Sequence, residues 1–196
     1  MKRILLLLLL TTFLTKPCWS QTEEDKKITF FNITKVSYSS LHKARADRFV
    51  EGEGNFITDV NDSGSIWGLN TVTGVFLFKK LSLGVGLGLD GYSDPNLNTM
   101  PAYFDLRYYL KEQKRGLNTY INIGPAINPF GENSRLRKGT ILNLGAGYVI
   151  EAGESTNLIV DIFYNHKTLS LTPEKLKDTD TTIVLDAFGF GIGIVF

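Results

Sequence analysis

The strongest constraint on the fold is the segment LSLGVGLGLD at residues 81–90, in which polarity alternates without exception. Every odd position carries an aliphatic side chain, and every even position carries Ser, Gly or Asp. A period of two sustained over this length predicts a β-strand whose two faces meet different surroundings.

Similar alternation recurs along the chain and predicts further strands. With two less regular stretches included, the candidate strands are 28–40, 66–79, 81–90, 103–110, 117–128, 141–151, 157–165 and 188–196. The connections alternate in length: 79–80, 111–116 and 152–156 are short, whereas 41–65, 93–101, 129–139 and 168–181 are long. Short turns at one end, long loops at the other and an even strand number predict an all-β fold, an eight-stranded antiparallel up-and-down transmembrane β-barrel.

The distribution of polar residues indicates which face of the strands points outward. In a soluble ligand-binding barrel such as a lipocalin, the apolar side chains would point inward. Here the apolar face is continuous, whereas the other face carries glycine, asparagine and charged residues. This pattern favours an exterior that faces lipid, where a closed barrel leaves no backbone polar group unpaired.

This orientation places five polar residues inside the barrel at mid-depth: Lys35, Asp105, Arg107, Asn122 and Asp161. A basic side chain that faced lipid at that depth would cost about 2–4 kcal/mol, which supports the inward assignment. Two cations meet two anions, and an eight-stranded barrel is about filled by its own side chains. We therefore predict a neutral polar network that plugs the lumen, with a gated ion path as the alternative.

Some segments fit the barrel pattern less simply. Pro125 cannot donate a backbone hydrogen bond to a ladder, so we expect it at the outer rim, where its strand leaves the sheet. The stretch 41–65 is long for a loop; it either extends the first two strands above the membrane or holds a short helix near 43–49. Aromatic residues near strand ends are expected to form girdles at the membrane interfaces, namely Trp67, Tyr92, Tyr103, Tyr148 and Tyr164.

The C-terminal segment GFGIGIVF, residues 189–196, has a terminal aromatic residue preceded by alternating apolar residues. This arrangement, with glycine at position 191, resembles the signal that barrel-assembly machinery recognises in Gram-negative outer-membrane proteins. The resemblance implies export to the cell outer membrane. It assigns the assembly signal to Gly191, Ile192, Ile194 and Phe196.

A second resemblance lies within residues 70–110. This segment contains the patterns TVxGxxF and PxxxDxRYY, carried by Thr71, Val72, Gly74, Pro101, Asp105, Arg107, Tyr108 and Tyr109. Together with the glycine-alternating strand between them, these patterns resemble a largely uncharacterised family of small outer-membrane β-barrel domains of the OmpA/OmpX type. The resemblance implies a fold and a membrane but no agreed activity.

The N-terminus has the features of a signal peptide. Lys2 and Arg3 precede an apolar run over 4–14 that is too short to span a bilayer, and cleavage is expected after Ser20. The expected organisation is a cleaved signal peptide, 1–20, followed by an outer-membrane barrel domain, 21–196. Cleavage removes Cys18, the one cysteine, so the mature chain has no thiolate for a disulfide, a metal or a nucleophile. Lys+Arg falls from 21 to 18 against 20 Asp+Glu, so the formal net charge changes from +1 to −2 and does not indicate nucleic-acid binding.

Enzymes are known on this scaffold, chiefly lipid A deacylases and acyltransferases. Their chemistry needs a histidine base, a hydroxyl nucleophile and an acidic group. His166 and Thr168 loosely match the deacylase pattern of histidine followed two residues later by serine, and His42 has Ser39, Ser40 and Asp47 nearby in sequence. We interpret both histidines as polar rim residues, with a lipid A acyl-modifying enzyme as the alternative.

The sequence therefore predicts a non-enzymatic outer-membrane barrel with a filled lumen, acting structurally or by binding through its extracellular loops. A small-solute channel is a second alternative. The expected partners are outer-membrane lipid, lipopolysaccharide, the assembly machinery during insertion and an unidentified loop-binding partner. Loop charges available for binding are Lys43, Arg45, Arg48, Glu51, Glu53, Arg135, Arg137 and Lys138.

No cofactor or metal site is predicted. The glycines at 86, 88 and 91 match the spacing of a dinucleotide-binding turn, which requires a helix to follow the last glycine. After Gly91 the sequence has no helical pattern. We expect the glycines at 84, 86 and 88 to leave space in the lumen for side chains of facing strands.

Overall fold

In the computed structural model, the described residues are 29–50, 54–59, 64–93, 98–111, 115–127, 136–153, 156–171 and 181–196, and nearly all of them lie in β-strands. The strands are β1 (Phe30–Val50), β2 (Gly54–Asp59), β3 (Ser65–Phe78), β4 (Leu81–Tyr92), β5 (Asn98–Tyr109), β6 (Gly116–Ile127), β7 (Leu136–Glu151), β8 (Asn157–Leu171) and β9 (Thr181–Val195). In this part of the chain no helix is long and apolar enough to cross a bilayer. The predicted signal peptide, 1–20, lies outside the described residues.

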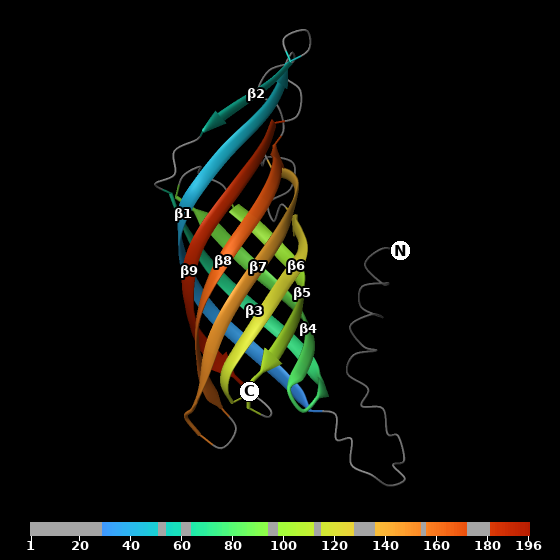
Figure 1. The fold of residues 1–196 in the computed structure, drawn as a ribbon, viewed down its shortest axis with the longest axis vertical. Coiled ribbons are helices and arrows are strands. Elements are labelled where there is room, and N and C mark those ends of the chain that lie inside the picture. The colour runs from blue at the N-terminus through green and yellow to red at the C-terminus, as the bar shows by residue number, and fades with distance from the viewer. Residues whose placement is uncertain are drawn as a thin grey trace, which may run out of the picture.

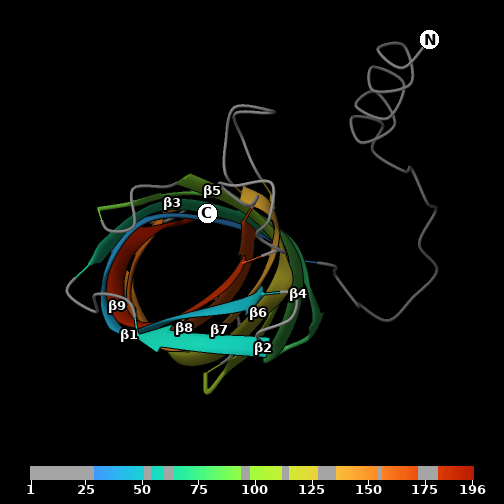
Figure 2. The same cartoon turned by 90° about the horizontal axis from the view of Figure 1, so that it is seen from above.

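Consecutive strands pair antiparallel, and the ring closes where β1 pairs with β9 (Figures 1 and 2). Eight strands, β1 and β3–β9, make up this closed barrel, which confirms the predicted fold class. The closing ladder brings the last strand against the first, with Val195 opposite Ile33.

The ninth strand, β2, pairs with the upper part of β1, from Arg45 opposite Asp59 to Val50 opposite Gly54. β2 therefore pairs with the part of β1 that lies above the β1–β3 ladder, which ends at Ser40. Of the two alternatives for the stretch 41–65, the extended strand is correct and the helix near 43–49 is wrong. Figure 1 shows the β1–β2 pair rising above the rest of the barrel.

One side of the barrel is taller than the other, because β7, β8, β9 and β1 continue upward past the ends of β4, β5 and β6 (Figure 1). The sequence-based limits were too short on this side, since 136–140, 166–171 and 181–187 belong to strands, and also on β5, where 98–102 do. In the upper segments of β8 and β9 the polarity inverts, so that Leu169, Ile183 and Leu185 are buried inside the barrel. An apolar-outward pattern does not identify such segments.

In the lower part of the barrel the faces are oriented as predicted. On β4, Leu83, Val85, Leu87 and Leu89 point outward and are 41–59% exposed. The inward glycines leave room for large side chains, as expected, but these come mainly from the neighbouring strands β3 and β5 and not from strands across the lumen. A Cβ at Gly86 would overlap the Tyr103 ring, and one at Gly88 would lie 3.0 Å from Pro101.

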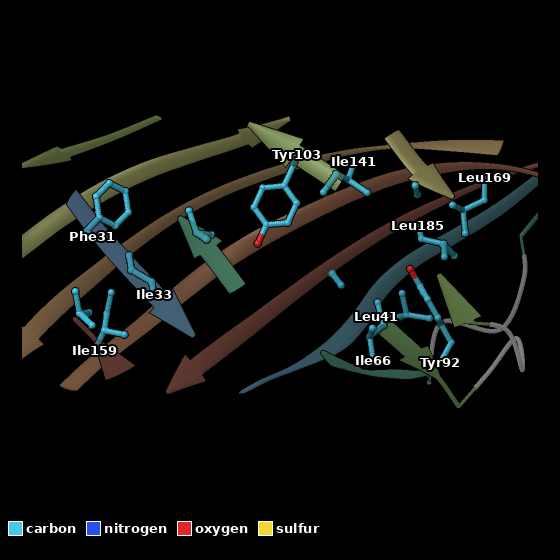
Figure 3. Close-up of a cluster of buried hydrophobic side chains, with 14 of the residues drawn as sticks. Phe31, Ile33, Leu41, Ile66, Tyr92, Tyr103, Ile141, Ile159, Leu169 and Leu185 are labelled. Carbon is cyan, nitrogen blue, oxygen red and sulfur yellow. The ribbon is translucent and has the colours of Figure 1, made fainter. Parts of the chain in front are cut away.

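Buried apolar side chains form one cluster along the lumen, with a group toward each end and Tyr103 and Ile141 between them (Figure 3). Phe31, Ile33 and Ile159 belong to the group near the short turns, and Leu41, Leu169 and Leu185 to the group near the upper rim. The predicted aromatic girdle is wrong for Tyr92 and Tyr103, whose side chains are each 5% exposed within the lumen. Their sequence parity with Asp90 and Asp105 placed them on the inward face. Trp67 and Tyr148 are exposed on the outer face, as the girdle requires.

Pro125 lies two residues before the end of β6, opposite Thr140 of β7. The β5–β6 ladder is interrupted beside it, between the pairs Pro101–Ala126 and Phe104–Ile123. The missing backbone donor therefore lies at a local interruption of one ladder. Pairing resumes at Ala126 and Ile127, so the expectation that the strand leaves the sheet at Pro125 is wrong.

Candidate functional site

All five residues predicted for the lumen are buried, and the structure brings them together. Lys35 pairs with Asp161, with 2.6 Å between Nζ and Oδ2. Arg107 pairs with Asp105, with 3.1 Å between Nη2 and Oδ2. With its amide nitrogen turned toward Asp105, Asn122 donates to Oδ2 at 2.8 Å. We call this set the lower cluster.

Tyr120 and Asn118 complete the lower cluster, although the sequence reasoning missed both. The Tyr120 hydroxyl accepts a hydrogen bond from Lys35 Nζ at 3.0 Å, and the Arg107 guanidinium carbon lies 4.4 Å from the centre of the Tyr120 ring. Asn118 accepts from Arg107 Nη1 at 3.0 Å and donates to the Gly147 carbonyl. Asn118, Tyr120 and Asn122 lie two residues apart along β6, and this spacing could have placed all three on the inward face.

A second set of buried polar residues lies nearer the upper rim, and we call it the upper cluster. Lys167 pairs with Asp90, with 2.8 Å between Nζ and Oδ2, and donates to the Tyr92 hydroxyl at 2.7 Å. Thr99 also donates to Asp90, at 3.4 Å. Lys167 was missed because the predicted strand ended at Asn165, six residues before the end of β8 at Leu171.

Between the two clusters lies a polar cavity of about 20 Å³. Its lining includes the cations of both clusters, Lys35 and Lys167, and uncharged polar side chains such as Asn70, Tyr103 and Asn165. This volume suits about one water molecule, which needs roughly 10–15 Å³. The lumen therefore contains two balanced ionic layers separated by a small polar space.

A different polar group lies on the outer face of the tall side, and we call it the outer-face cluster. Asp186 of β9 accepts a hydrogen bond from the Tyr164 hydroxyl at 2.6 Å, and its Oδ1 lies 2.7 Å from His166 Nδ1. Lys43 of β1 stands opposite Asp186 in the β1–β9 ladder. A register shift between Leu41 and Lys43 leaves both His42 and Lys43 exposed.

The outer-face cluster supplies part of what acyl-transfer chemistry needs. His166 has an acidic partner. The two serines near His42 lie on different faces, because Ser39 is buried in the lumen and Ser40 is exposed. Thr168 follows His166 on the same outer face of β8. Asp47 lies higher on β1, opposite Thr182 rather than near His42.

The residues resembling an assembly signal lie on the closing strand β9, except Phe196, which follows its last residue. Ile192 and Phe196 are exposed on the outer face, and Ile194 is half-buried. Gly191 leaves room for Asp161, since a Cβ there would lie 2.6 Å from Asp161 Oδ1. Its small size therefore accommodates the lower cluster.

The described residues contain no group of three His, Cys, Asp or Glu side chains placed to hold a metal ion. Of the loop charges considered for binding, Glu51, Glu53 and Arg135 lie outside the described residues. Lys43 and Lys138 are exposed on the outer face of the tall side.

The fold is shared with one solved outer-membrane barrel, and two further barrels superpose less well. The outer membrane protein OprG from Pseudomonas aeruginosa superposes with a TM-score of 0.54 at 13% identity, over 85% of this chain and 93% of that chain. For outer membrane protein AlkL the TM-score is 0.49 at 13% identity, over 93% and 96% of the two chains. For the KdgM porin it is 0.32 at 13% identity, over 83% and 98%. No family model and no curated protein sequence matches the chain, and the narrower resemblance to OmpA/OmpX-type domains stays a prediction.

Proposed function

We propose that this chain is a non-enzymatic integral outer-membrane β-barrel whose filled lumen does not conduct ions. Its function then resides on its outer surface and in the part of the barrel that stands above the membrane. The observation that carries the proposal is the filling of the lumen by two ionic clusters and two apolar groups.

The outer surface supports a membrane location. Outward apolar side chains are exposed on opposite sides of the barrel, from Val85 on β4 to Ile162 on β8 at 59% and 68%. Monomeric soluble proteins rarely expose contiguous apolar patches larger than a few hundred Å². An exterior that is apolar around its circumference, combined with charges inside, is the arrangement expected in lipid. The fold shared with the outer membrane protein OprG agrees with this location.

The composition of the lumen supports an interior that does not conduct ions. From the short turns upward, the interior passes through an apolar group, the lower cluster, the small cavity, the upper cluster and a second apolar group. The six charges of the two clusters form three pairs, so each cation has an anionic partner. An ion crossing the lumen would have to disrupt these pairs. Leaving one buried charge unpaired costs about 3–5 kcal/mol.

The experiment is single-channel recording of the purified mature protein in a planar lipid bilayer. The folded state is verified beforehand by its faster gel mobility without heating. We expect no steady conductance from the wild-type protein. A steady conductance that disappears in Arg107→Gln would overturn the proposal and favour a small-solute channel.

The geometry of His166 and Asp186 favours one second candidate, a lipid A acyl-modifying enzyme. A carboxylate 2.7 Å from Nδ1 orients an imidazole as in hydrolytic triads. On that reading the nucleophile would be Thr168 or water. Mass spectrometry of lipid A from cells with and without the protein separates the candidates, because the non-enzymatic barrel leaves acylation unchanged.

A further inference from the structure

The outer face of the tall side carries an apolar groove of about 560 Å³ over β7, β8 and β9. Its walls are formed by large side chains, Leu144, Ile162, Tyr164 and Phe188, and the small residue Ala146 leaves the space between them. These residues occupy two adjacent ladder rows, since Ala146 stands opposite Ile162 and Leu144 opposite Tyr164. β7, β8 and β9 lie side by side in Figure 1.

The outer-face cluster lies one outward row above the groove. Tyr164 and Phe188 face each other across the β8–β9 ladder, and the next outward pair above them is His166 and Asp186. Two outward residues on one strand are about 6.6 Å apart along the chain. Tyr164 joins the two regions directly, because its ring lines the groove while its hydroxyl binds Asp186.

The side chains that remain accessible in this cluster are one lysine and two histidines. Asp186 is only 17% exposed and is engaged by Tyr164 and His166, whereas the His166 side chain is 39% exposed. Lys43 and His42 are exposed beside it, and the His42 ring lies 5.9 Å from that of Phe188. The upper end of the groove therefore presents an ammonium and two imidazoles around a carboxylate that already has partners.

We propose that this face binds one phosphate-bearing acylated lipid of net negative charge, with an acyl chain in the groove and the phosphate at Lys43, His42 and His166. The inference rests on the proposed membrane location and goes beyond it by naming a ligand class and a site. The groove holds the chain by van der Waals packing against its walls, and Lys43 selects the charge of the headgroup. A Lys or Arg near anionic lipid contributes about 1 kcal/mol, or roughly a fivefold preference.

Native mass spectrometry tests the site. The detergent-solubilised barrel is offered an equimolar mixture of phosphatidylglycerol and phosphatidylcholine with identical chains, and the retained lipid is counted. We expect one phosphatidylglycerol to be retained, with about a fivefold preference over phosphatidylcholine from the contact with Lys43. Lys43→Ser should remove most of the preference, and Ala146→Phe should reduce retention of both lipids by filling the groove.

Two variants serve as matched controls. Ala102→Phe places the same ring on the outer face of β5, away from the groove, and Lys111→Ser removes a lysine at the opposite end of the barrel. Both should retain phosphatidylglycerol as the wild type does. Inorganic phosphate at millimolar concentration should not displace the lipid, because it lacks the chain that the groove holds.

Equal retention of the two lipids by the wild type would overturn the inference, as would the same retention in Ala146→Phe and Ala102→Phe. Displacement by inorganic phosphate would also contradict it and would indicate a simple anion site. Either failure leaves the closed lumen intact, because conductance measures that separately. Conversely, a conducting barrel that still selects phosphatidylglycerol would overturn only the closed lumen.

Discussion

Lys167 of β8 and Asp90 of β4 form an ion pair across the full width of the barrel, with 2.8 Å between Nζ and Oδ2. Their strands are four apart in either direction around the ring of eight. Lys35 of β1 reaches Tyr120 of β6 across a second diameter. The two clusters therefore connect strands that share no ladder, at two different heights.

Lys167→Met is expected to destabilise the barrel strongly. It leaves the Asp90 carboxylate buried without its cation, which costs about 3–5 kcal/mol. Adding Asp90→Asn removes that charge and should recover most of the loss. The measurement is the free energy of unfolding from urea titration in lipid vesicles. Lys111→Met, at an exposed turn, should change it by only about 0.5 kcal/mol; equal effects of Lys167→Met and Lys111→Met would contradict a structural ion pair.

Tyr120 contributes both a hydroxyl and a ring to the lower cluster. Tyr120→Phe removes the acceptor for Lys35 but keeps the ring under Arg107, so we expect a loss of about 1 kcal/mol. Tyr120→Leu also removes the cation–π contacts, which adds about 2 kcal/mol where the cation is desolvated. Urea titration of both variants measures the two contributions separately. If both variants unfold at the same urea concentration, the ring is not stabilising the cations.

The glycines of β4 allow a direct test of lumen packing. A Cβ at Gly86 would overlap the Tyr103 ring, so Gly86→Ala should cost about 1–3 kcal/mol through overpacking. Tyr103→Leu removes the ring, and the double variant should lose less than the sum of the single variants. Gly91→Ala is the control, because its Cβ meets only the end of the Asn98 side chain, at 3.3 Å. Additive losses at Gly86 and Tyr103 would show that the two residues do not compete for space.

The closed barrel was predictable because the lower strands face chemically different surroundings on their two sides. Residues 81–90 and 103–110 alternate strictly, so both the strands and their inward face follow from parity. The same alternation placed Lys35, Arg107 and their partners on the inward faces of their strands, and therefore in one lumen. It could not show which cation meets which anion, since that depends on the stagger between strands that are distant in sequence.

The upper strand segments were missed for a physical reason. Around Leu169 and Leu185 the apolar side chains point inward, so the pattern has the opposite sign to that of the lower strands. The upper cluster was not predicted for the same reason, because Lys167 lay outside the predicted strand 157–165. The outer-face cluster also depends on this extension, since His166 and Asp186 meet only when β8 and β9 continue upward together.

The height of the membrane on the barrel is testable with two lysines on the outer face of β8. Ile162 lies in the apolar part of the strand, one outward row above the interfacial pair of Val160 and Tyr148, and Ser170 lies near the upper end. Ile162→Lys should cost about 2–4 kcal/mol and Ser170→Lys about 0–1 kcal/mol, because a lipid-facing charge is most unfavourable near the bilayer midplane. Ile162→Met controls for the change in side-chain size. The free energies come from urea titration in vesicles, and a Ser170→Lys loss as large as that of Ile162→Lys would place the upper strand segments within the bilayer instead of above it.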